Sequence, residues 1–181
     1  MKRIVLTGPK SSGKSNIGLR LAELRNLPFF DLDEVLEDIF EEEHKMRLSF
    51  REIFRRHGET KFRELELQAA KRVATMEGTV MLSTGGTTFT LSALRDELVP
   101  DSYVVLLSNE PNELWHRTSR KGIPAYLEKE VDPKAAFFQR VERVITTVTP
   151  YADLVLDTND LSIEEVAQML DVELTQREVF K

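Results

Sequence analysis

The stretch Arg3-Ile4-Val5-Leu6-Thr7-Gly8-Pro9-Lys10-Ser11-Ser12-Gly13-Lys14-Ser15 joins a short apolar run to a loop that contains two glycines. From Gly8 onward it matches the pattern Gly-x-x-x-x-Gly-Lys-Ser/Thr. Glycines at these places let successive main-chain N–H groups turn inward, and the start of a following helix adds partial positive charge. The stretch therefore predicts a β-strand, a phosphate-binding loop (P-loop) and a helix, in that order.

Two side chains of this loop have the chemistry of phosphoryl transfer. We expect Lys14 to reach the β- and γ-phosphates as a catalytic residue, and the Ser15 hydroxyl to ligate Mg²⁺. Lys10 either contacts phosphate or is an exposed, solvated lysine. The alternative for the whole motif is a glycine-rich turn with an incidental Lys-Ser pair. The loop residues expected to bind the nucleotide are Gly8, Pro9, Lys10, Ser11, Ser12, Gly13, Lys14 and Ser15.

Short apolar runs alternate with longer segments of helical period along the chain. This alternation is typical of an α/β fold in which helices cover both faces of a parallel sheet. No repeat, low-complexity tract or Gly/Ser linker divides the chain, so we expect a single domain over residues 1–181. The apolar runs are 3–7, 27–30, 79–84, 103–107 and 154–157.

Several helix starts have recognisable caps. Ser49 with Glu52, and Ser162 with Glu165, form capping boxes. Asp132-Pro133 places a cap residue and an N1 proline before another helix. The apolar residues of that helix are spaced to form one stripe that packs on the core, namely Phe137, Val141, Val144, Ile145 and Val148.

Composition limits the classes of function. The chain has 181 residues, 41% of them hydrophobic, which suffices for one buried core, and it has no cysteine for a disulfide, thiolate metal site or nucleophile. The first apolar run ends at Thr7, too short for a signal peptide or a membrane span. The net charge of −6 argues against nucleic acid as the main partner. We expect a cytoplasmic, monomeric protein with no membrane or nucleic-acid partner.

A pair of carboxylates follows the second apolar run. Asp31 and Asp33 are two residues apart at a predicted strand end, so both point into the crevice at the carboxyl edge of the sheet. We expect Asp31 to hold the Mg²⁺ shell through water, and Asp33 to accept a hydrogen bond and the proton of an acceptor hydroxyl. The alternative is that Asp33 is a simple helix N-cap. The other acids between 31 and 43 are expected on a solvated helix face.

Two further segments have side chains suited to the acceptor. Arg63 offers a planar fork for a substrate carboxylate, and Glu66, three residues later on the same helix face, can hold that fork in place. A surface ion pair is the alternative. Gly85 and Gly86 follow the third apolar run, where they permit close approach of a ligand, although an ordinary tight turn uses glycines equally well.

Between Trp115 and Asp132 the helical period is weak, Gly122 and Pro124 interrupt it, and charged residues dominate. We interpret residues 116–131 as a lid over the site. Trp115 itself is expected to pack in the core or the lid.

The order of these motifs resembles the shikimate kinase family. The resemblance comprises the P-loop, Asp31-Leu32-Asp33, the stretch 50–66 that contains Ile53-Phe54, Gly58-Glu59, Phe62-Arg63 and Glu66, then Gly85-Gly86, and more weakly 152–158. It implies a three-layer fold of the P-loop NTPase type, a five-stranded parallel sheet in the order 2-3-1-4-5, and ATP and Mg²⁺ as cofactors. It also implies that Asp33, Arg63, Gly85 and Gly86 hold shikimate, that Arg117 covers adenine, and that Thr158 lies beside the base.

Some positions depart from the family pattern, and they lie on the substrate side. Thr87 replaces a third glycine, and Ile123 replaces a lid arginine that contacts the phosphates and the substrate. Arg120 or Lys121 could supply the missing charge. A second arginine for the substrate carboxylate is absent four residues before Tyr151, where Thr147 stands. Arg140 and Arg143 are the nearest candidates, or else ordinary exposed helix cations; Thr87, Arg140 and Arg143 are included among the expected substrate-binding residues.

The sequence therefore predicts an ATP-dependent kinase that phosphorylates the 3-hydroxyl of shikimate in aromatic amino-acid biosynthesis. The departures leave two alternatives. One is a P-loop kinase for another small hydroxylated metabolite, and the other is a nucleotide-binding module that no longer catalyses.

Overall fold

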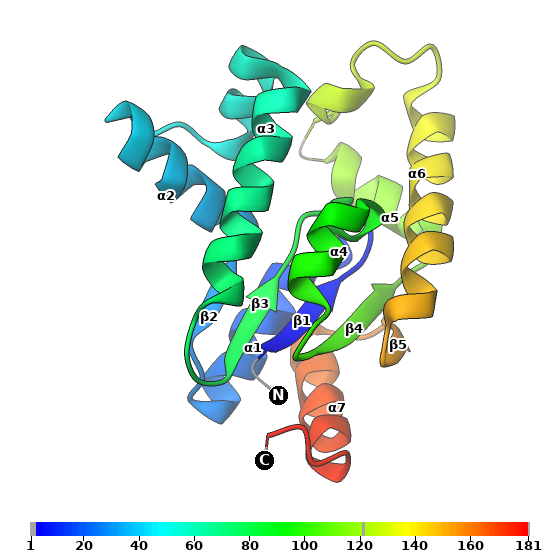
Figure 1. The fold of residues 1–181 in the computed structure, drawn as a ribbon. Helices are drawn as coiled ribbons and strands as arrows, with labels where there is room; N and C mark the ends of the chain where they lie inside the picture. Colours follow the sequence, from blue (N-terminus) through cyan, green and yellow to red (C-terminus); the bar gives the residue numbers. More distant parts are fainter. Residues whose placement is uncertain (1–2, 121, 181) are drawn as a thin grey trace.

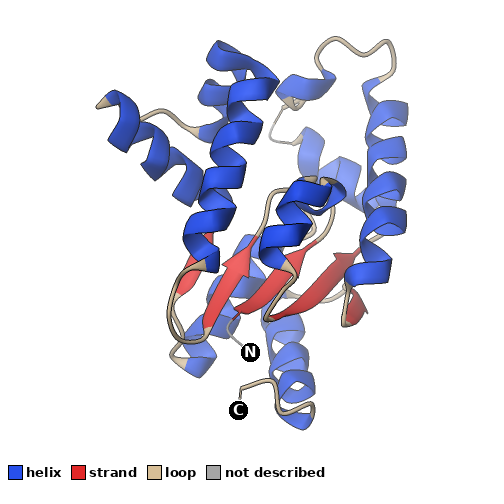
Figure 2. Ribbon diagram, viewed as in Figure 1, coloured by secondary structure: helices blue, strands red, loops and turns tan. Residues whose placement is uncertain are grey.

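The computed structural model describes residues 3–120 and 122–180 and contains a parallel sheet of five strands (Figures 1 and 2). The strand order β2-β3-β1-β4-β5 confirms the expected order. Every neighbouring pair is parallel. The strands are β1 (Arg3–Thr7), β2 (Phe29–Asp31), β3 (Val80–Ser83), β4 (Ser102–Ser108) and β5 (Leu154–Asp157).

Helices connect and cover the strands, as parallel pairing requires. The α-helices are α1 (Lys14–Arg25), α2 (Leu32–His44), α3 (Phe50–Ala74), α4 (Ser92–Leu98), α5 (Pro111–Ser119), α6 (Pro133–Val148) and α7 (Ile163–Gln176). Short 3₁₀ helices are η1 (Thr88–Thr90), η2 (Ala125–Leu127) and η3 (Thr149–Tyr151). Figure 1 shows α1 and α7 on one side of the sheet and α3, α4 and α6 on the other, with α2 packed outside α3.

Both faces of the sheet are buried, and β1 shows how its residues divide between them. Ile4 and Leu6 pack in the cluster that contains α1 and α7. Val5 points the other way, into the cluster formed with α2, α3, α4 and α6. Side chains alternate along a strand, so a continuous apolar run supplies both cores at once.

The predicted helix starts are confirmed. The side chains of Ser49 and Ser162 each accept a hydrogen bond from the main-chain N–H of the N3 residue. The side chains of those N3 residues, Glu52 and Glu165, accept a bond from the main-chain N–H of the cap residue. The Asp132 side chain caps α6 by accepting from the main-chain N–H groups of residues 134 and 135. The predicted stripe on α6 is largely buried, with Ile145 only partly so.

The predicted lid is partly helical, because α5 continues to Ser119. Beyond it, Leu127 of η2 is fully buried in a small cluster with Leu114, Phe137 and Val141. The centroids of the Trp115 and Phe137 rings are 5.5 Å apart, which confirms that Trp115 has a packing role. No helix in the described part of the chain is long and apolar enough to cross a membrane.

Removal of the cap of α7 should destabilise the fold modestly. We expect Ser162→Ala to lower the free energy of unfolding by about 1 kcal/mol, because the main-chain N–H group of Glu165 loses its acceptor. Urea unfolding followed by circular dichroism measures this. Ser92→Ala is the matched control, since exposed Ser92 opens α4 without capping it. Equal losses in the two variants would contradict the assigned cap.

Candidate active site

The P-loop lies at the carboxyl end of β1, directly before α1, as the sequence predicts. Gly8 has a φ of 139°, and a Cβ there would overlap the main-chain oxygen of Leu107 on β4. Only glycine fits this position. The loop therefore begins pressed against the neighbouring strand, and its main chain then curls into the first turn of α1.

Lys14 is folded back onto its own loop. Its side chain is buried, and Nζ donates to the main-chain oxygen of Pro9 at 2.7 Å. Burial lowers the pKa of Lys14 to about 8, and the nearby carboxylates of Asp33 and Asp31 only partly oppose this effect. An anion bound in the loop would therefore meet a buried ammonium group whose hydrogen bonds go to neutral partners in its own loop.

Ser15 and Asp31 are in direct contact. The Ser15 hydroxyl donates to Asp31 Oδ2 at 2.5 Å, and it lies 3.2 Å from the hydroxyl of Ser83 at the end of β3. Hydroxyl and carboxylate oxygens are ligands that suit Mg²⁺. The residues predicted to hold the metal therefore lie together, and Ser83 is a further oxygen beside them that the sequence analysis did not assign to the metal.

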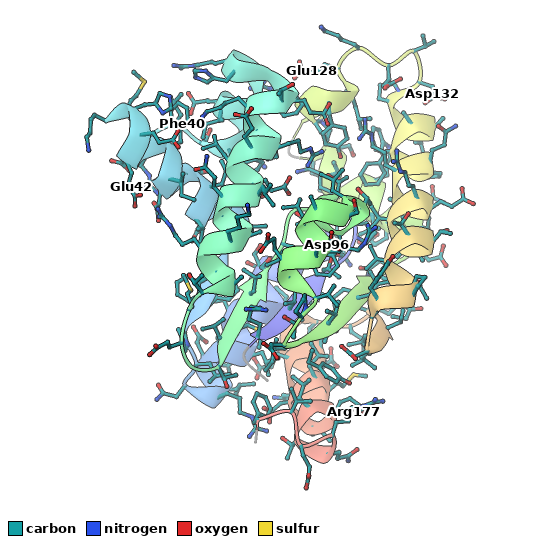
Figure 3. The ribbon with its side chains drawn as sticks, in the orientation of Figure 1. Phe40, Glu42, Asp96, Glu128, Asp132 and Arg177 are labelled. Carbon is teal, nitrogen blue, oxygen red and sulfur yellow. The ribbon has the colours of Figure 1, made fainter. Side chains whose placement is uncertain are left out.

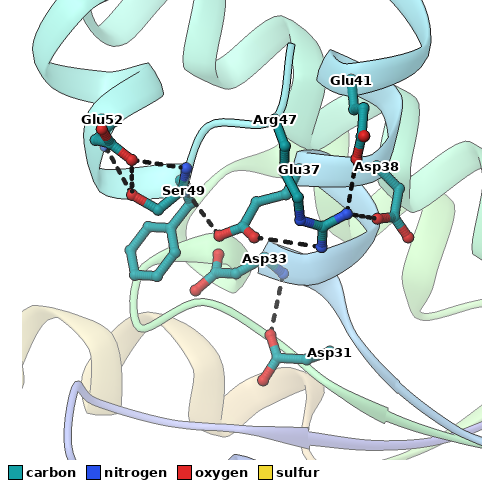
Figure 4. A network of polar contacts seen from close by, with 9 residues as sticks. Asp31, Asp33, Glu37, Asp38, Glu41, Arg47, Ser49 and Glu52 are labelled. Atoms are coloured by element: carbon teal, nitrogen blue, oxygen red, sulfur yellow. Dashed lines mark hydrogen bonds and ion pairs between the residues drawn. The ribbon is translucent and has the colours of Figure 1, made fainter. Parts of the chain in front are cut away.

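The alternative that Asp33 caps a helix is wrong. Asp31, the last residue of β2, is the N-cap of α2, and its Oδ1 accepts from the main-chain N–H of Asp33 at 3.0 Å (Figure 4). Asp33 is the second residue of α2, in the first turn and not at the strand end, and its carboxylate has no capping role. Burial, and then the charges of Asp31 and Glu66, raise the pKa of Asp33 to about 7.

Arg63 is held from several sides. Its Nη1 donates to Glu66 at 2.7 Å, and Glu66 is only 2% exposed, so the pair is not a surface ion pair. The other terminal nitrogen, Nη2, donates to Glu59 at 3.3 Å and to the Thr87 hydroxyl at 3.4 Å. Thr88, which the sequence analysis did not single out, donates to Glu66 at 2.6 Å and fixes its orientation. The guanidinium is thus positioned before any ligand arrives.

The turn after β3 is packed against the P-loop and the carboxylates. A Cβ on Gly86 would lie 2.9 Å from the main-chain nitrogen of Lys10, and one on Gly85 would lie 3.4 Å from an Asp33 oxygen. The glycines at these positions permit a close approach between two loops of the protein itself. The acceptor candidates Asp33, Arg63 and this turn therefore gather beside the phosphate loop.

The remaining candidates are more scattered. Arg117 pairs with Glu113 at 2.8 Å on α5, and the buried Thr158 donates its hydroxyl to the main-chain oxygen of Ser108 at 3.3 Å. Arg140 stacks 4.6 Å from the centre of the Tyr126 ring. Arg143 is exposed on α6. The structure does not place these side chains in contact with the Asp33 and Arg63 group.

Of the two candidates for the missing lid charge, Arg120 is exposed at the end of α5. Lys121 lies outside the described residues. The exposed Ile123 occupies the position of the expected arginine. Farther along the lid, Glu128, which is labelled in Figure 3, pairs with Arg55 of α3 at 2.9 Å, so an ion pair joins the lid to α3.

The segment that carries Asp33 is braced by a surface network. Arg47 binds Asp38 at 3.0 Å and Glu41 at 2.8 Å, and Glu37 accepts from the main-chain N–H of Phe50 at 2.8 Å (Figure 4). These contacts tie α2 to the start of α3. Most acids of the 31–43 run therefore lie on a solvated face, but Glu37 has a specific structural contact.

Comparison with known proteins agrees with this arrangement. The sequence model of the shikimate kinase family matches residues 10–174, nearly the whole chain.

The chain belongs to the shikimate kinase family.

Family members resemble it along their length. A shikimate kinase of Mesorhizobium japonicum is 33% identical over 92% of this chain and 77% of its own. One of Caldanaerobacter subterraneus subsp. tengcongensis is 30% identical over 93% of both chains. Among solved structures, shikimate kinase from Acinetobacter baumannii in complex with shikimate has a TM-score of 0.80 at 25% identity, covering 100% of this chain and 96% of that one.

The raised pKa of Asp33 has a consequence for stability. The pKa rises from 3.8 to about 7 on folding, so between these values the folded protein binds more protons than the unfolded chain, and stability falls as the pH rises. We expect Asp33→Asn to raise the free energy of unfolding of the ligand-free protein at pH 8 by about 1–3 kcal/mol. This gain should shrink towards zero near pH 4.

Urea unfolding in EDTA over a pH series measures the effect. Asp96→Asn is the control, because Asp96 is an exposed acid of α4 and should change little at any pH. A gain from Asp33→Asn that is independent of pH would contradict the assigned cause.

Proposed function

We propose that the protein is a shikimate kinase, which transfers the γ-phosphoryl group of ATP to the 3-hydroxyl of shikimate in aromatic amino-acid biosynthesis. Family membership supports the reaction class, and a related structure is described as a complex with shikimate. The observation that carries the proposal is the gathering of Asp33, Arg63 and the Gly85-Gly86 turn beside the P-loop. Groups suited to the phosphate donor and to a hydroxylated acid thus lie beside one another at one edge of the sheet.

The P-loop fits a triphosphate. Gly8 leaves no room for a side chain, and Lys14 lies inside the loop, where its hydrogen-bond partners among the described residues are a main-chain oxygen and a hydroxyl. Phosphate oxygens are stronger acceptors for an ammonium group than a neutral carbonyl. We expect the ammonium of Lys14 to leave Pro9 and to stabilise the charge that builds up on the transferred group.

Mg²⁺ would be held by Ser15 and, through water, by Asp31. Bound there, the ion would neutralise charge on the phosphates during transfer. Among the described residues, no group of three or more His, Cys, Asp and Glu side chains could hold a metal alone. A site that needs the phosphates as further ligands is the usual arrangement for Mg²⁺.

On the acceptor side, Asp33 is suited to accept a proton. Its pKa of about 7 is near the ordinary working pH of a general base. One terminal nitrogen of Arg63, Nη1, donates to Glu66. The other, Nη2, makes longer hydrogen bonds to Glu59 and Thr87. We expect the substrate carboxylate to displace Glu59 and to bind this second nitrogen.

We further propose that residues 1–181 act as one kinase domain with a lid at residues 116–131. Closure of the lid would exclude water, which otherwise competes with the acceptor for the γ-phosphoryl group. Arg117 and Thr158 would bind the adenine end of the nucleotide, with Lys10 near the phosphates. Arg140 and Arg143 remain candidates for a second contact with the substrate carboxylate.

A kinase for another small hydroxylated acid is the second candidate function. The observation that favours it is the Thr87 hydroxyl, which lies 3.4 Å from Arg63 where the family pattern has glycine. A hydroxyl at this place narrows the approach to Arg63 and adds a hydrogen-bonding group beside it, which could select a different acid. Ile123 in the lid adds to this argument.

A coupled assay of ADP release tests the assignment. We expect turnover that depends on shikimate, with a kcat between about 1 and 100 per second, as is typical for kinases. The control compares quinate and other hydroxy acids at equal concentration. If one of these is phosphorylated and shikimate is not, the second candidate is correct and shikimate is excluded.

Asp33→Asn should slow phosphoryl transfer by about 10²–10⁴-fold, because an amide cannot accept the acceptor proton. The Kd for ATP should stay within about threefold, since Asp33 is not expected to bind the nucleotide. Single-turnover kinetics and calorimetry measure the two quantities, with Asp96→Asn as the surface control. A large loss of ATP affinity with little change in transfer rate would contradict the role of Asp33.

A further inference from the structure

The tip of the P-loop holds a strained residue. Ser11 has a φ of 67°, in the left-handed region that residues with a Cβ rarely occupy. Other described non-glycine residues with positive φ include Asn26 and Lys45, which end α1 and α2, where this conformation is common. Ser11 lies in a turn in which the main-chain N–H of Ser12 donates to the oxygen of Pro9 at 3.4 Å, and a tertiary contact adds to this local support.

That contact comes from the base of the lid. Thr118 donates its hydroxyl to the Ser11 hydroxyl oxygen at 2.9 Å, across 107 positions of sequence. Thr118 lies in the last turn of α5 and is only 2% exposed. A buried hydroxyl must satisfy its hydrogen bond, and Ser11 is the partner that the structure gives it. The bond orients the Ser11 side chain and ties the loop tip to α5.

The opposite side of the loop tip is also fixed. Gly86 approaches the main-chain nitrogen of Lys10 so closely that an added Cβ would lie 2.9 Å from it. The tip, Lys10-Ser11, is therefore held between the turn after β3 and the last turn of α5. Since main-chain N–H groups of such a loop bind phosphate, their directions depend on these two contacts.

We propose that Thr118 is a positioning residue for the nucleotide phosphates, acting through Ser11. The inference rests on the nucleotide-binding half of the proposed function and is independent of the acceptor. Thr118 adjoins Arg117 and lies on the same helix as Leu114, which packs against Leu127 of the lid. The hydrogen bond thus connects the lid and the P-loop, and its loss should weaken nucleotide binding more than it slows phosphoryl transfer.

Thr118→Val tests the proposal, because valine keeps the shape and removes the donor. We expect the Kd for ADP to rise about fivefold, as for loss of one hydrogen bond. The KM for ATP should rise similarly, while kcat stays within about twofold. Trp115, the single tryptophan of the chain, lies three residues before Thr118 and provides a fluorescence signal for ADP titration without acceptor. Thr149→Val is the matched control, since its hydroxyl donates to the main-chain oxygen of Ile145 outside the site.

A second background separates positioning from general structural damage. Ser11→Gly removes both the strain and the acceptor hydroxyl, so adding Thr118→Val to it should change the Kd for ADP by less than about 1.5-fold. If Thr118→Val weakens ADP binding equally in both backgrounds, or if it lowers kcat without changing the Kd, the proposal is wrong. ADP titration needs no shikimate, so an error in the acceptor assignment would leave this test intact.

Discussion

The structure depends on charge held out of water at the carboxyl edge of the sheet. Lys14, Asp31, Asp33 and Glu66 lie close enough to influence one another, and burial moves the pKa of Lys14 down and that of Asp33 up. Such a cluster costs folding free energy in the absence of ligand. Burial also strengthens the attraction of the Lys14 ammonium group for phosphate and of the Asp33 carboxylate for a proton. The burial that destabilises the ligand-free protein therefore also prepares these two groups for catalysis.

The parallel sheet brings this cluster together. Strands β1, β2 and β3 all end at the same edge, and the P-loop, Asp31 and Ser83 follow from these ends. Gly8 lets the P-loop pack closely against β4, where any side chain would overlap the main-chain oxygen of Leu107. Because both faces of the sheet are filled by side chains, the edge is a rigid support, and the polar groups there keep their positions without a ligand.

The acceptor groups have a different support. Asp33 and Arg63 belong to α2 and α3, which stand beside the sheet and are braced by Arg47, Glu37 and the capping box at Ser49 (Figure 4). Arg63 is tied back to the turn after β3 through Glu66 and Thr88. The phosphate-donor groups of the site are therefore fixed by the sheet, whereas the positions of the acceptor groups depend on helix packing. Departures from the family pattern such as Thr87 lie among the acceptor groups.

The sequence by itself determined the features that consecutive residues encode: the five apolar runs, the capping boxes and the place of the P-loop between the first strand and the first helix. It also placed Arg63 and Glu66 on one helix face. It left open whether Asp33 caps a helix or faces the acceptor, and it did not single out Asp31 as a cap, which the structure shows it to be. Only the tertiary structure decided the hydrogen bond from Thr88 to Glu66 and the one between Thr118 and Ser11. The physical reason is that these contacts join segments set by strand order and helix packing, which no local pattern of residues specifies.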